Sequence, residues 1–226
     1  MVLADVSKVK AVAFDLDGTL VDSALDLTVA VQDCLSELGL PLCSEEQVRL
    51  WIGNGAEVLM HRALMFATSA DVEETRLAEV MPRFKWHYQQ NLQKHSRLYA
   101  GVLAVLGRLH DSGIRLAIVT NKPYAFTVPL LAGFGLSAFF SLVLGGDSLD
   151  KMKPDPQPLL HLMHEWGLKE DEIIMVGDSK NDILAAKAAG IGSIGLTYGY
   201  NYGEDIALSC PNAVCHQLND ILPLIL

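Results

Sequence analysis

Two aspartates two positions apart, Asp15 and Asp17, carry the strongest chemical signal in this sequence. They come directly after a short apolar run and are followed by Gly18 and Thr19. Because alternate residues of an extended strand face the same side, both carboxylates can address one site, and Gly18 permits the sharp turn that leaves them open. One aspartate can then act as a nucleophile while the other transfers protons. A pair of this kind on its own is more often a plain acidic turn.

A second acidic segment, residues 177–182, supplies Asp178 and Asp182 after another apolar run. Mg²⁺ prefers oxygen ligands and keeps several of its waters, so two or three carboxylates are enough to hold it. Asp178 is therefore a predicted metal ligand. Asp182 fits two interpretations equally well: a direct ligand, or a first-turn helix residue that the helix dipole stabilises.

A lysine in a proline-stiffened stretch offers one positive charge on a rigid mount. Lys153 begins residues 153–156, which contain two prolines. A rigidly held ammonium suits a phosphoryl oxygen. If this segment stood alone, a solvated lysine before a helix would be the better interpretation.

Five apolar runs predict the strands that must position these residues. Continuous apolar runs of this length suit strands that are buried on both faces of a parallel sheet. Helical patterns separate the later runs and end at Gly113 and Gly190, because glycine just past the last apolar residue is a helix stop signal. The runs are residues 10–14, 115–119, 141–144, 172–176 and 191–196, and the helical patterns contain Leu103, Leu106, Leu109, Ile183, Leu184 and Ala188.

This alternation of strands and helices predicts an α/β fold with a Rossmann-like, doubly wound parallel sheet. In such sheets the ligand lies at the carboxyl ends of the strands. Asp15, Thr120 and Asp178 each follow a predicted strand, so we expect them to share that edge. Three polar residues at three strand ends indicate a site more strongly than any one of them.

A long segment is inserted between the first two of these polar strand ends. Asp15 and Thr120 are 105 positions apart, whereas a strand-helix-strand crossover needs about a dozen residues. The insert has helical patterns and one capping box, which predict an all-helical cap over residues 20–98 and leave residues 1–19 and 99–226 as the core. The patterns span residues 24–38, 44–47 and 71–95.

Two prolines leave local alternatives open. Pro82 either interrupts a helix or starts a second one within residues 71–95. Pro129 either kinks the helix that follows Thr120 or marks its start.

Composition and charge narrow the class of protein. Half of the 226 residues are hydrophobic and 19% are charged, so the chain should bury a large core. The net charge of −10, with no basic stripe, argues against nucleic acid as a ligand. The sequence has no apolar run near the ~18 to 20 residues of a membrane span and no signal-peptide pattern in residues 1–10, so we expect a cytoplasmic protein. Reduced thiols are expected at Cys34, Cys43, Cys210 and Cys215.

Taken in order, four motifs resemble those of the haloacid dehalogenase superfamily, and the resemblance covers nearly the whole chain. The helical insert after the first motif is similar to the small helical cap of that superfamily. Within it, residues 15–23, 51–55, 121–123 and 153–154 resemble the bacterial phosphoglycolate phosphatases. The four motifs are Asp15-x-Asp17-Gly18-Thr19, Thr120-Asn121, Lys153-Pro154 and Gly177-Asp178-x-x-Asn181-Asp182.

The resemblance implies a phosphatase that uses Mg²⁺ and acts on a small phosphorylated metabolite, with 2-phosphoglycolate as the leading candidate. It implies that Asp15 attacks phosphorus to form an aspartyl-phosphate. Asp17 would protonate the leaving alkoxide and then activate water, while Lys153 balances the charge.

The same resemblance implies the binding residues. Phosphoryl contacts would come from Gly18, Thr19, Thr120 and the backbone at Asn121. The cation would be held by Asp15, the carbonyl oxygen of Asp17, Asp178 and, in support, Asp182. Asn54 and Gly55 would contact the rest of the substrate from the cap, although residues 53–55 could also be a plain turn.

Other functions fit part of this pattern. A sugar-phosphate mutase shares the motifs and the cap and is the main alternative. A dehalogenase would lack the second acid, here Asp17, and a phosphonoacetaldehyde hydrolase would need a cap lysine, which residues 11–84 do not contain. A phosphorylated signalling receiver would be a compact domain without a large insert. Because specificity depends on the geometry of the closed cap, the exact substrate stays open, as does the oligomeric state.

Three further patterns have ordinary explanations. Residues 190–195 match a dinucleotide-binding glycine spacing, but they follow a predicted helix and form a predicted strand, which is the reverse of that fingerprint. His161 and His164 fit a packed helix better than a metal site. Cap core is expected at Val58, Leu59, Leu64, Met65 and Phe66.

Overall fold

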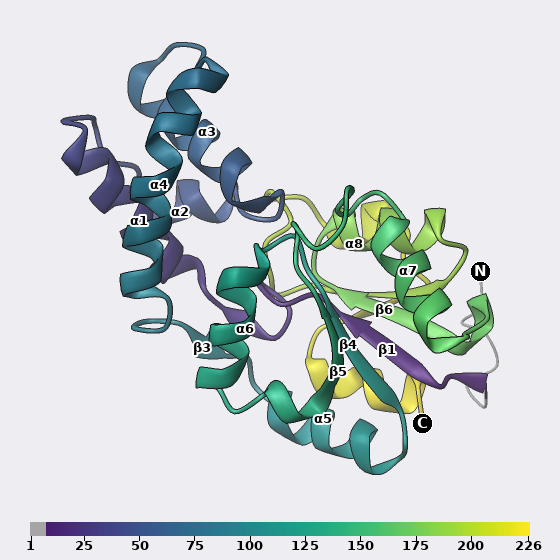
Figure 1. The fold of residues 1–226 in the computed structure, drawn as a ribbon. Helices are drawn as coiled ribbons and strands as arrows, with labels where there is room; N and C mark the ends of the chain where they lie inside the picture. The colour runs from purple at the N-terminus through teal and green to yellow at the C-terminus, as the bar shows by residue number, and fades with distance from the viewer. Residues whose placement is uncertain (1–7) are drawn as a thin grey trace.

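The computed structural model describes residues 8–226 and contains a six-stranded parallel sheet (Figure 1). Its order is β5-β4-β1-β6-β7-β8. From β1 the chain first adds β4 and β5 on one side, and then returns to add β6, β7 and β8 on the other side of β1. This order confirms the predicted doubly wound α/β fold. Residues 1–7, which begin the predicted core and the segment assessed as a signal peptide, lie outside the described residues. The strands are β1 (Ala11–Phe14), β4 (Arg115–Val119), β5 (Phe140–Leu144), β6 (Ile173–Gly177), β7 (Gly192–Leu196) and β8 (Ala213–Cys215).

Helices cover both faces of the sheet. Side chains alternate between the two faces along each strand, so a continuous apolar run makes both faces apolar and both must be buried. Val12 and Phe14 of β1 share one apolar cluster with α5 (Val102–Asp111), α6 (Tyr124–Gly133) and the 3-10 helix η5 (Leu218–Leu224). Ala11 and Ala13 face the opposite cluster. That cluster contains side chains of α7 (Gln157–Trp166) and α8 (Lys180–Ala188). The strands are therefore buried on both sides, as their continuous apolar runs predicted.

Each of the five predicted runs contains a strand, and residues 192–196 form β7 rather than a nucleotide-binding turn. The sixth strand, β8, was not predicted. Its three residues, Ala213–Cys215, are apolar but too few to stand out as a strand in the sequence. Short edge strands of this kind give little signal because one side of the strand has no neighbour to pack against.

The helical patterns identified the helices, but the apolar residues that mark these patterns do not all lie on a buried face. Leu103 and Leu184 are exposed by 53% and 44%, and Ala188 is exposed as well. Of the pattern residues, Leu106, Leu109 and Ile183 are buried, and they share the buried faces with Val102 and Val105 in α5 and with Ala185 and Ala186 in α8. The small side chains of Ala185 and Ala186 permit close approach of α8 to the sheet.

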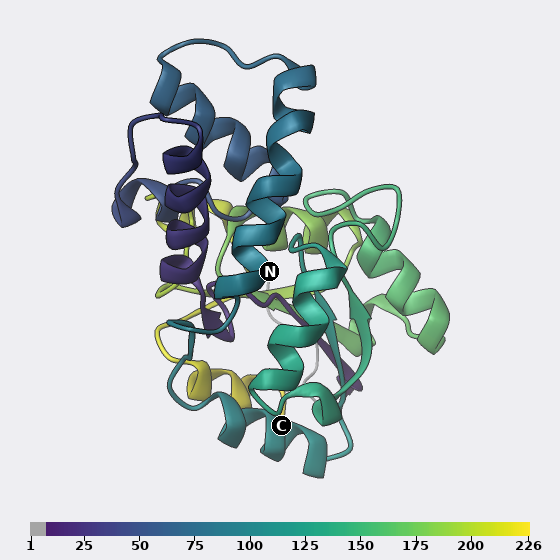
Figure 2. The ribbon, with the colours of Figure 1, turned by 60° about the vertical axis from the view of Figure 1, so that its left-hand side comes forward.

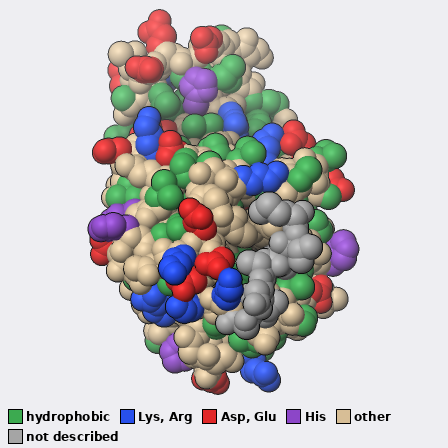
Figure 3. Space-filling model, turned by 90° about the vertical axis from the view of Figure 1, so that its right-hand side faces the viewer, with side chains coloured by type: hydrophobic (Ala, Val, Ile, Leu, Met, Phe, Trp, Pro, Cys, Tyr) green, Lys and Arg blue, Asp and Glu red, His purple; other side chains and the backbone are tan. Residues whose placement is uncertain are grey.

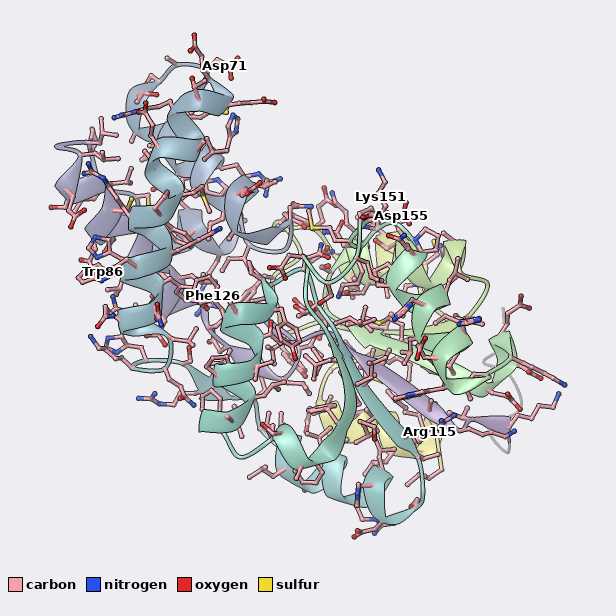
Figure 4. The ribbon with its side chains drawn as sticks, in the orientation of Figure 1. Asp71, Trp86, Arg115, Phe126, Lys151 and Asp155 are labelled. Carbon is pink, nitrogen blue, oxygen red and sulfur yellow. The ribbon has the colours of Figure 1, made fainter. Side chains whose placement is uncertain are left out.

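The inserted segment contains four helices, α1 (Ala24–Glu37), α2 (Glu45–Arg49), α3 (Gly55–Thr68) and α4 (Glu74–Asn91). Figure 2 shows α1 and α4 packed along each other, and the four helices share an apolar cluster apart from those of the sheet. Phe126 of α6 joins that cluster from the core, with its ring 4.9 Å from that of Tyr88 (Figure 4). The predicted limits of this cap, residues 20 and 98, fall beside β2 (Val21–Asp22) and β3 (Arg97–Leu98), a short antiparallel pair between the two connecting segments.

Both prolines lie inside continuous helices. Pro82 is within α4 and Pro129 is within α6, so neither starts a helix. Each proline lacks the N–H that would bond to the preceding turn, and the surrounding packing holds the helix despite that loss. In α3, Leu59 and Leu64 are buried as expected, whereas Met65 and Phe66 are 40% and 41% exposed, so their assignment to the cap core was wrong.

The remaining described elements are three short 3-10 helices: η2 (Ser137–Phe139), η3 (Glu170–Glu172) and η4 (Ile206–Ser209). Within residues 8–226, no helix has both the length and the apolar character needed to cross a membrane. Acidic and basic side chains are interspersed on the face drawn in Figure 3. All four cysteines are free thiols.

Candidate active site

The three polar strand ends meet at one edge of the sheet, as the sequence predicted. Asp15 follows β1, Thr120 follows β4 and Asp178 follows β6, and β1 lies between the other two strands. The ladder continues to the site itself, because the Asp15 backbone N–H donates to Val176 at 3.0 Å and that of Thr120 donates to Leu144 at 2.9 Å. The backbone on which these side chains are mounted is thus fixed by sheet hydrogen bonds.

Three buried carboxylates, those of Asp15, Asp178 and Asp182, form a compact cluster at this edge. One oxygen from each lies within 4.8 Å of the others. Thr19 Oγ1 donates to Asp178 Oδ1 and the Tyr200 backbone N–H donates to Oδ2, each at 2.6 Å. Burial and the neighbouring charges of Asp15 and Asp182 raise the pKa of Asp178 well above its usual range. The three carboxyl groups therefore oppose one another's ionisation.

These residues fit a divalent cation. Asp15 Oδ1 is buried, and apart from the Lys153 ammonium 3.0 Å away it has no partner among the described residues. Carboxylate oxygens at this spacing are the donor set that a hard cation prefers, and a bound cation would offset the like-charge repulsion within the cluster. The carboxylates of the predicted ligands Asp15, Asp178 and Asp182 are brought together, and the ligand expected from Asp17 is its backbone carbonyl oxygen rather than its carboxylate.

Asp182 occupies both of its oxygens with protein partners. Lys153 Nζ donates to Oδ1 at 2.5 Å, and Ser179 donates to Oδ2 through its backbone N–H and its hydroxyl, at 3.0 and 3.1 Å. The Ser179 contacts belong to the first turn of α8, which the helix dipole interpretation anticipated. Asp182 is thus positioned to hold Lys153 and to sit beside a cation.

Lys153 reaches the cluster from the loop that joins β5 to α7. Its side chain is 2% exposed, and Nζ lies 3.0 Å from Asp15 Oδ1. Burial lowers the pKa of Lys153, but the charges of Asp15 and Asp182 outweigh that effect and the pKa is raised. The ammonium therefore stays charged beside the predicted nucleophile. Lys151 and Asp155 lie on the same loop, as Figure 4 shows.

Asp17 is held away from this cluster by a second lysine. Lys122 Nζ donates to both oxygens of Asp17, at 3.0 and 3.1 Å, and Ser23 Oγ donates to Oδ1 at 2.5 Å. Lys122 also contacts the hydroxyl of Tyr88 on α4. The predicted proton-transfer residue is thus linked to the cap through Lys122.

Gly18 has no room for a side chain. Its φ is +91°, and a Cβ at this position would lie 2.3 Å from Asp178 Oδ2. Both the left-handed backbone and the close approach of Asp178 require glycine here. The turn that separates Asp15 from Thr19 is therefore built against the carboxylate cluster.

The cap loop, residues 50–54 between α2 and α3, contacts the core through the backbone carbonyl of Gly53. Gly53 O accepts from Asn121 Nδ2 at 2.9 Å and from Asn181 Nδ2 at 3.0 Å. Asn54, the predicted substrate contact, turns elsewhere: its Oδ1 accepts from Arg62 Nη2 at 3.0 Å. The side chain of Asn121 is thus used in cap docking, and that of Asn54 is used within the cap.

A cavity lies between the cap and the strand edge, and its empty space, including the part open to solvent, is about 450 Å³. It brings together several predicted residues with two that sequence reasoning missed, Lys122 and Tyr88. Lys122 directly follows the motif Thr120-Asn121, which is the signal that could have identified it, whereas nothing near Tyr88 in the sequence indicates its role. Asn54 is not among the lining residues. They are Asp15, Asp17, Leu27, Ile52, Gly53, Gly55, Ala56, Leu59, Tyr88, Thr120, Asn121, Lys122 and Pro123.

Residues 12–196 match the family model of haloacid dehalogenase-like hydrolases. Among curated proteins, a phosphoglycolate phosphatase of Pectobacterium atrosepticum is 46% identical over 227 residues, covering 99% of this chain and 95% of that protein. A phosphoglycolate phosphatase of Salmonella typhi is also 46% identical, over 95% of this chain and 92% of that protein.

Solved structures have the same fold. A protein of Haemophilus somnus described as a predicted phosphoglycolate phosphatase superposes with a TM-score of 0.93 at 42% identity, over 97% of this chain and 99% of that one. CbbY of Rhodobacter sphaeroides, solved in complex with phosphate, superposes with a TM-score of 0.79 at 22% identity, over 94% of this chain and 96% of that one. The second likeness bears on the fold alone.

Proposed function

This chain belongs to the haloacid dehalogenase-like hydrolase family, and from that premise we propose that it is a Mg²⁺-dependent phosphatase that converts 2-phosphoglycolate to glycolate and phosphate. The observation that carries the proposal is the buried group of side chains at the carboxyl ends of the parallel strands, which consists of Asp15, Asp178, Asp182 and Lys153. Relatives named phosphoglycolate phosphatase, alike over nearly the whole length, support the choice of substrate.

Asp15 is the nucleophile in this proposal. One of its oxygens attacks phosphorus, the bond from phosphorus to the ester oxygen breaks, and an aspartyl-phosphate forms. Lys153 Nζ, 3.0 Å from Asp15 Oδ1, counters the negative charge that gathers as the phosphoryl group approaches. Thr120 would donate to a phosphoryl oxygen, and its position in the lining of the same cavity as Asp15 supports this role.

Asp17 transfers the protons. It gives one to the leaving alkoxide oxygen as the ester bond breaks, and it takes one from the water that then attacks the aspartyl-phosphate. The second step returns Asp15 to its carboxylate form and releases phosphate. Both Asp15 and Asp17 line the same cavity, which allows one substrate position to serve both residues.

Asp15 and Asp178 would hold Mg²⁺ together with the carbonyl oxygen of Asp17, and Asp182, whose oxygens accept from Lys153 and Ser179, would support the site. When bound, the cation neutralises negative charge on the phosphoryl oxygens and orients them toward Asp15. Hydrolysis of a phosphate monoester can require acceleration of about 10²¹-fold, equal to about 29 kcal/mol. No single group supplies so much, so the nucleophile, the acid, the lysine and the cation must act together.

We also propose that the enzyme works in the cytoplasm. The supporting observation is that Cys34, Cys43, Cys210 and Cys215 are all free thiols, as in proteins of a reducing compartment.

A screen of small phosphate esters with and without Mg²⁺ tests the proposal. We expect release of inorganic phosphate from 2-phosphoglycolate that chelation abolishes and Mg²⁺ restores. The variant Asp178→Ala should need far more Mg²⁺, and Mg²⁺ should no longer raise its melting temperature as it raises that of the wild type.

Two results would overturn this function. Full activity in excess chelator would exclude the metal-dependent mechanism. An isomerised sugar phosphate in place of free phosphate would identify a mutase instead.

A further inference from the structure

Lys122 is the one cationic side chain among the described residues that line the catalytic cavity. It lies just before α6, and its side chain is 2% exposed. Nζ sits between the core and the cap: it donates to both oxygens of Asp17, contacts the Tyr88 hydroxyl, and lies 4.6 Å from the centre of the Tyr88 ring. A buried charge in this position has both a catalytic neighbour and a cap neighbour.

The pairing with Lys122 occupies Asp17. Both Asp17 oxygens accept from Lys122, and Oδ1 accepts from Ser23 as well. In this arrangement Asp17 directs no proton toward a leaving group. Proton transfer to the substrate therefore requires that Lys122 first release Asp17.

The cavity also limits where a second anionic group of the substrate can lie. The phosphoryl end must approach Asp15, so the other end of a small substrate faces Lys122, Tyr88 and the apolar cap side chains. A carboxylate buried there needs a paired cation, because an unpaired buried charge is very costly.

The cap arginines near the cavity already have partners. Arg49 pairs with Asp22 and Glu45, and Arg62 donates to the cap loop.

We propose that Lys122 binds the carboxylate of the substrate and, by moving from Asp17 to that carboxylate, releases Asp17 for proton transfer. This inference rests on the proposed function, since it concerns the same site and a substrate that bears a carboxylate. One ion pair replaces another, so the ammonium stays paired throughout. Asp17 takes its first proton from solvent and passes it to the leaving oxygen.

This exchange makes the carboxylate a condition for rapid chemistry rather than a binding contact alone. A phosphate ester without a carboxylate leaves Lys122 on Asp17, so its leaving group is not protonated. Such a substrate loses kcat as well as affinity, as expected when a remote group is used to assemble the catalytic arrangement.

A matched pair of substrates tests the role of Lys122. 2-Phosphoglycolate and 2-hydroxyethyl phosphate have the same chain length and differ in a carboxylate against a hydroxymethyl group. We expect the wild type to prefer phosphoglycolate in kcat/KM, and Lys122→Met to reduce that preference by at least about thirtyfold, as for loss of one partner of a buried charge pair. The exposed Lys151→Met is the charge-matched control, and it should keep the wild-type preference.

The outcomes separate the possible failures. If Lys122→Met slows both substrates equally, Lys122 only positions Asp17 and the inference is wrong. A wild type that hydrolyses both esters equally well would also overturn it, while the phosphatase function would stand. A wild type that hydrolyses neither ester with Mg²⁺ would instead refute the proposed function. Should the methionine variant fail to fold, Lys122→Gln, which can still hydrogen-bond to Asp17, decides by the same ratio.

Discussion

The two walls of the catalytic cavity are built in different ways. On the core wall, charged side chains extend from the ends of buried parallel strands. Groups behind this wall hold them, as Asp182 holds Lys153 and Lys153 pairs with Asp15. On the cap wall, most of the lining residues are apolar, and side chains of the core donate the hydrogen bonds that hold the wall in place. Gly53, for example, is held by Asn121 and Asn181 of the core.

This difference indicates that the core wall carries out the reaction and that the cap wall controls which substrate is bound. Sheet hydrogen bonds and burial fix the core wall, and a reacting group must stay within a fraction of an ångström of its productive position. A few separable hydrogen bonds hold the cap wall, which suits an element that must open for the substrate and close over it. Changes to the core wall should therefore abolish turnover, while changes to the cap wall should alter its degree.

The largest effect is expected on the core wall, from Asp15→Asn. An amide cannot attack phosphorus, so kcat should fall by at least about 10⁴-fold. The fold should survive, because the substitution removes one of three mutually repelling buried carboxylates. Steady-state turnover and a thermal melt without metal check both parts. Turnover within tenfold of the wild type would remove Asp15 from its role.

Lys153→Met should lower both stability and turnover, because it leaves Asp15 and Asp182 buried without their cation. Removal of one partner from a buried ion pair costs about 3 to 5 kcal/mol. The exposed Lys151, two residues away on the same loop, is the matched control, and Lys151→Met should change stability by less than about 0.5 kcal/mol. Chemical denaturation measures this difference, and equal losses would contradict the assignment of Lys153.

A smaller effect is expected where the cap docks. Asn181→Ala removes one of the two donors to Gly53 O, and Asn121 keeps the other. A hydrogen bond of this kind is worth about 1 kcal/mol, so kcat/KM should fall about fivefold through weaker cap closure. Asn181 also donates to the Tyr202 hydroxyl, so Tyr202→Phe serves as the control for that second contact. If Asn181→Ala lowered kcat/KM nearly as much as Asp15→Asn, the cap wall would be as important for turnover as the core wall, against this expectation.

The smallest effect is expected from Asn54→Ala. The sequence suggested that Asn54 contacts the substrate carboxylate, but its side chain accepts from Arg62 and does not line the cavity. Hydrolysis of phosphoglycolate and of an aryl phosphate should therefore change by less than about threefold and in parallel, as for a surface contact. A selective loss on phosphoglycolate would return Asn54 to the site and weaken the case for Lys122.

The sequence predicted most of the core wall because its pattern is local. An apolar run followed by an aspartate or a threonine identifies a strand and its end together, and parallel strands bring such ends to one edge. Asp15, Thr120 and Asp178 meet there for that reason. The resemblance of the four motifs added Lys153, which the spacing alone would not have placed beside Asp15.

Burial within helices was predicted less well, because a hydrophobic pattern does not choose between neighbouring small and large side chains. Leu103 and Leu184 face solvent, while Val102 and Ala185 pack against the core. Leu106 and Leu109 are buried in the same helix as the exposed Leu103, so only the tertiary arrangement shows which side of the helix packs on the sheet.

By itself the sequence determined the fold, the inserted helical segment and the edge at which the carboxylates gather, since each follows from periodicity and from what ends a strand. Only the tertiary structure decided how the cavity is closed. The contacts of Lys122 with Asp17 and Tyr88 join residues 105 and 34 positions apart, and Gly53 is held from Asn181, 128 positions away. No local pattern encodes such contacts, because they depend on how the cap packs on the core rather than on what either segment forms alone.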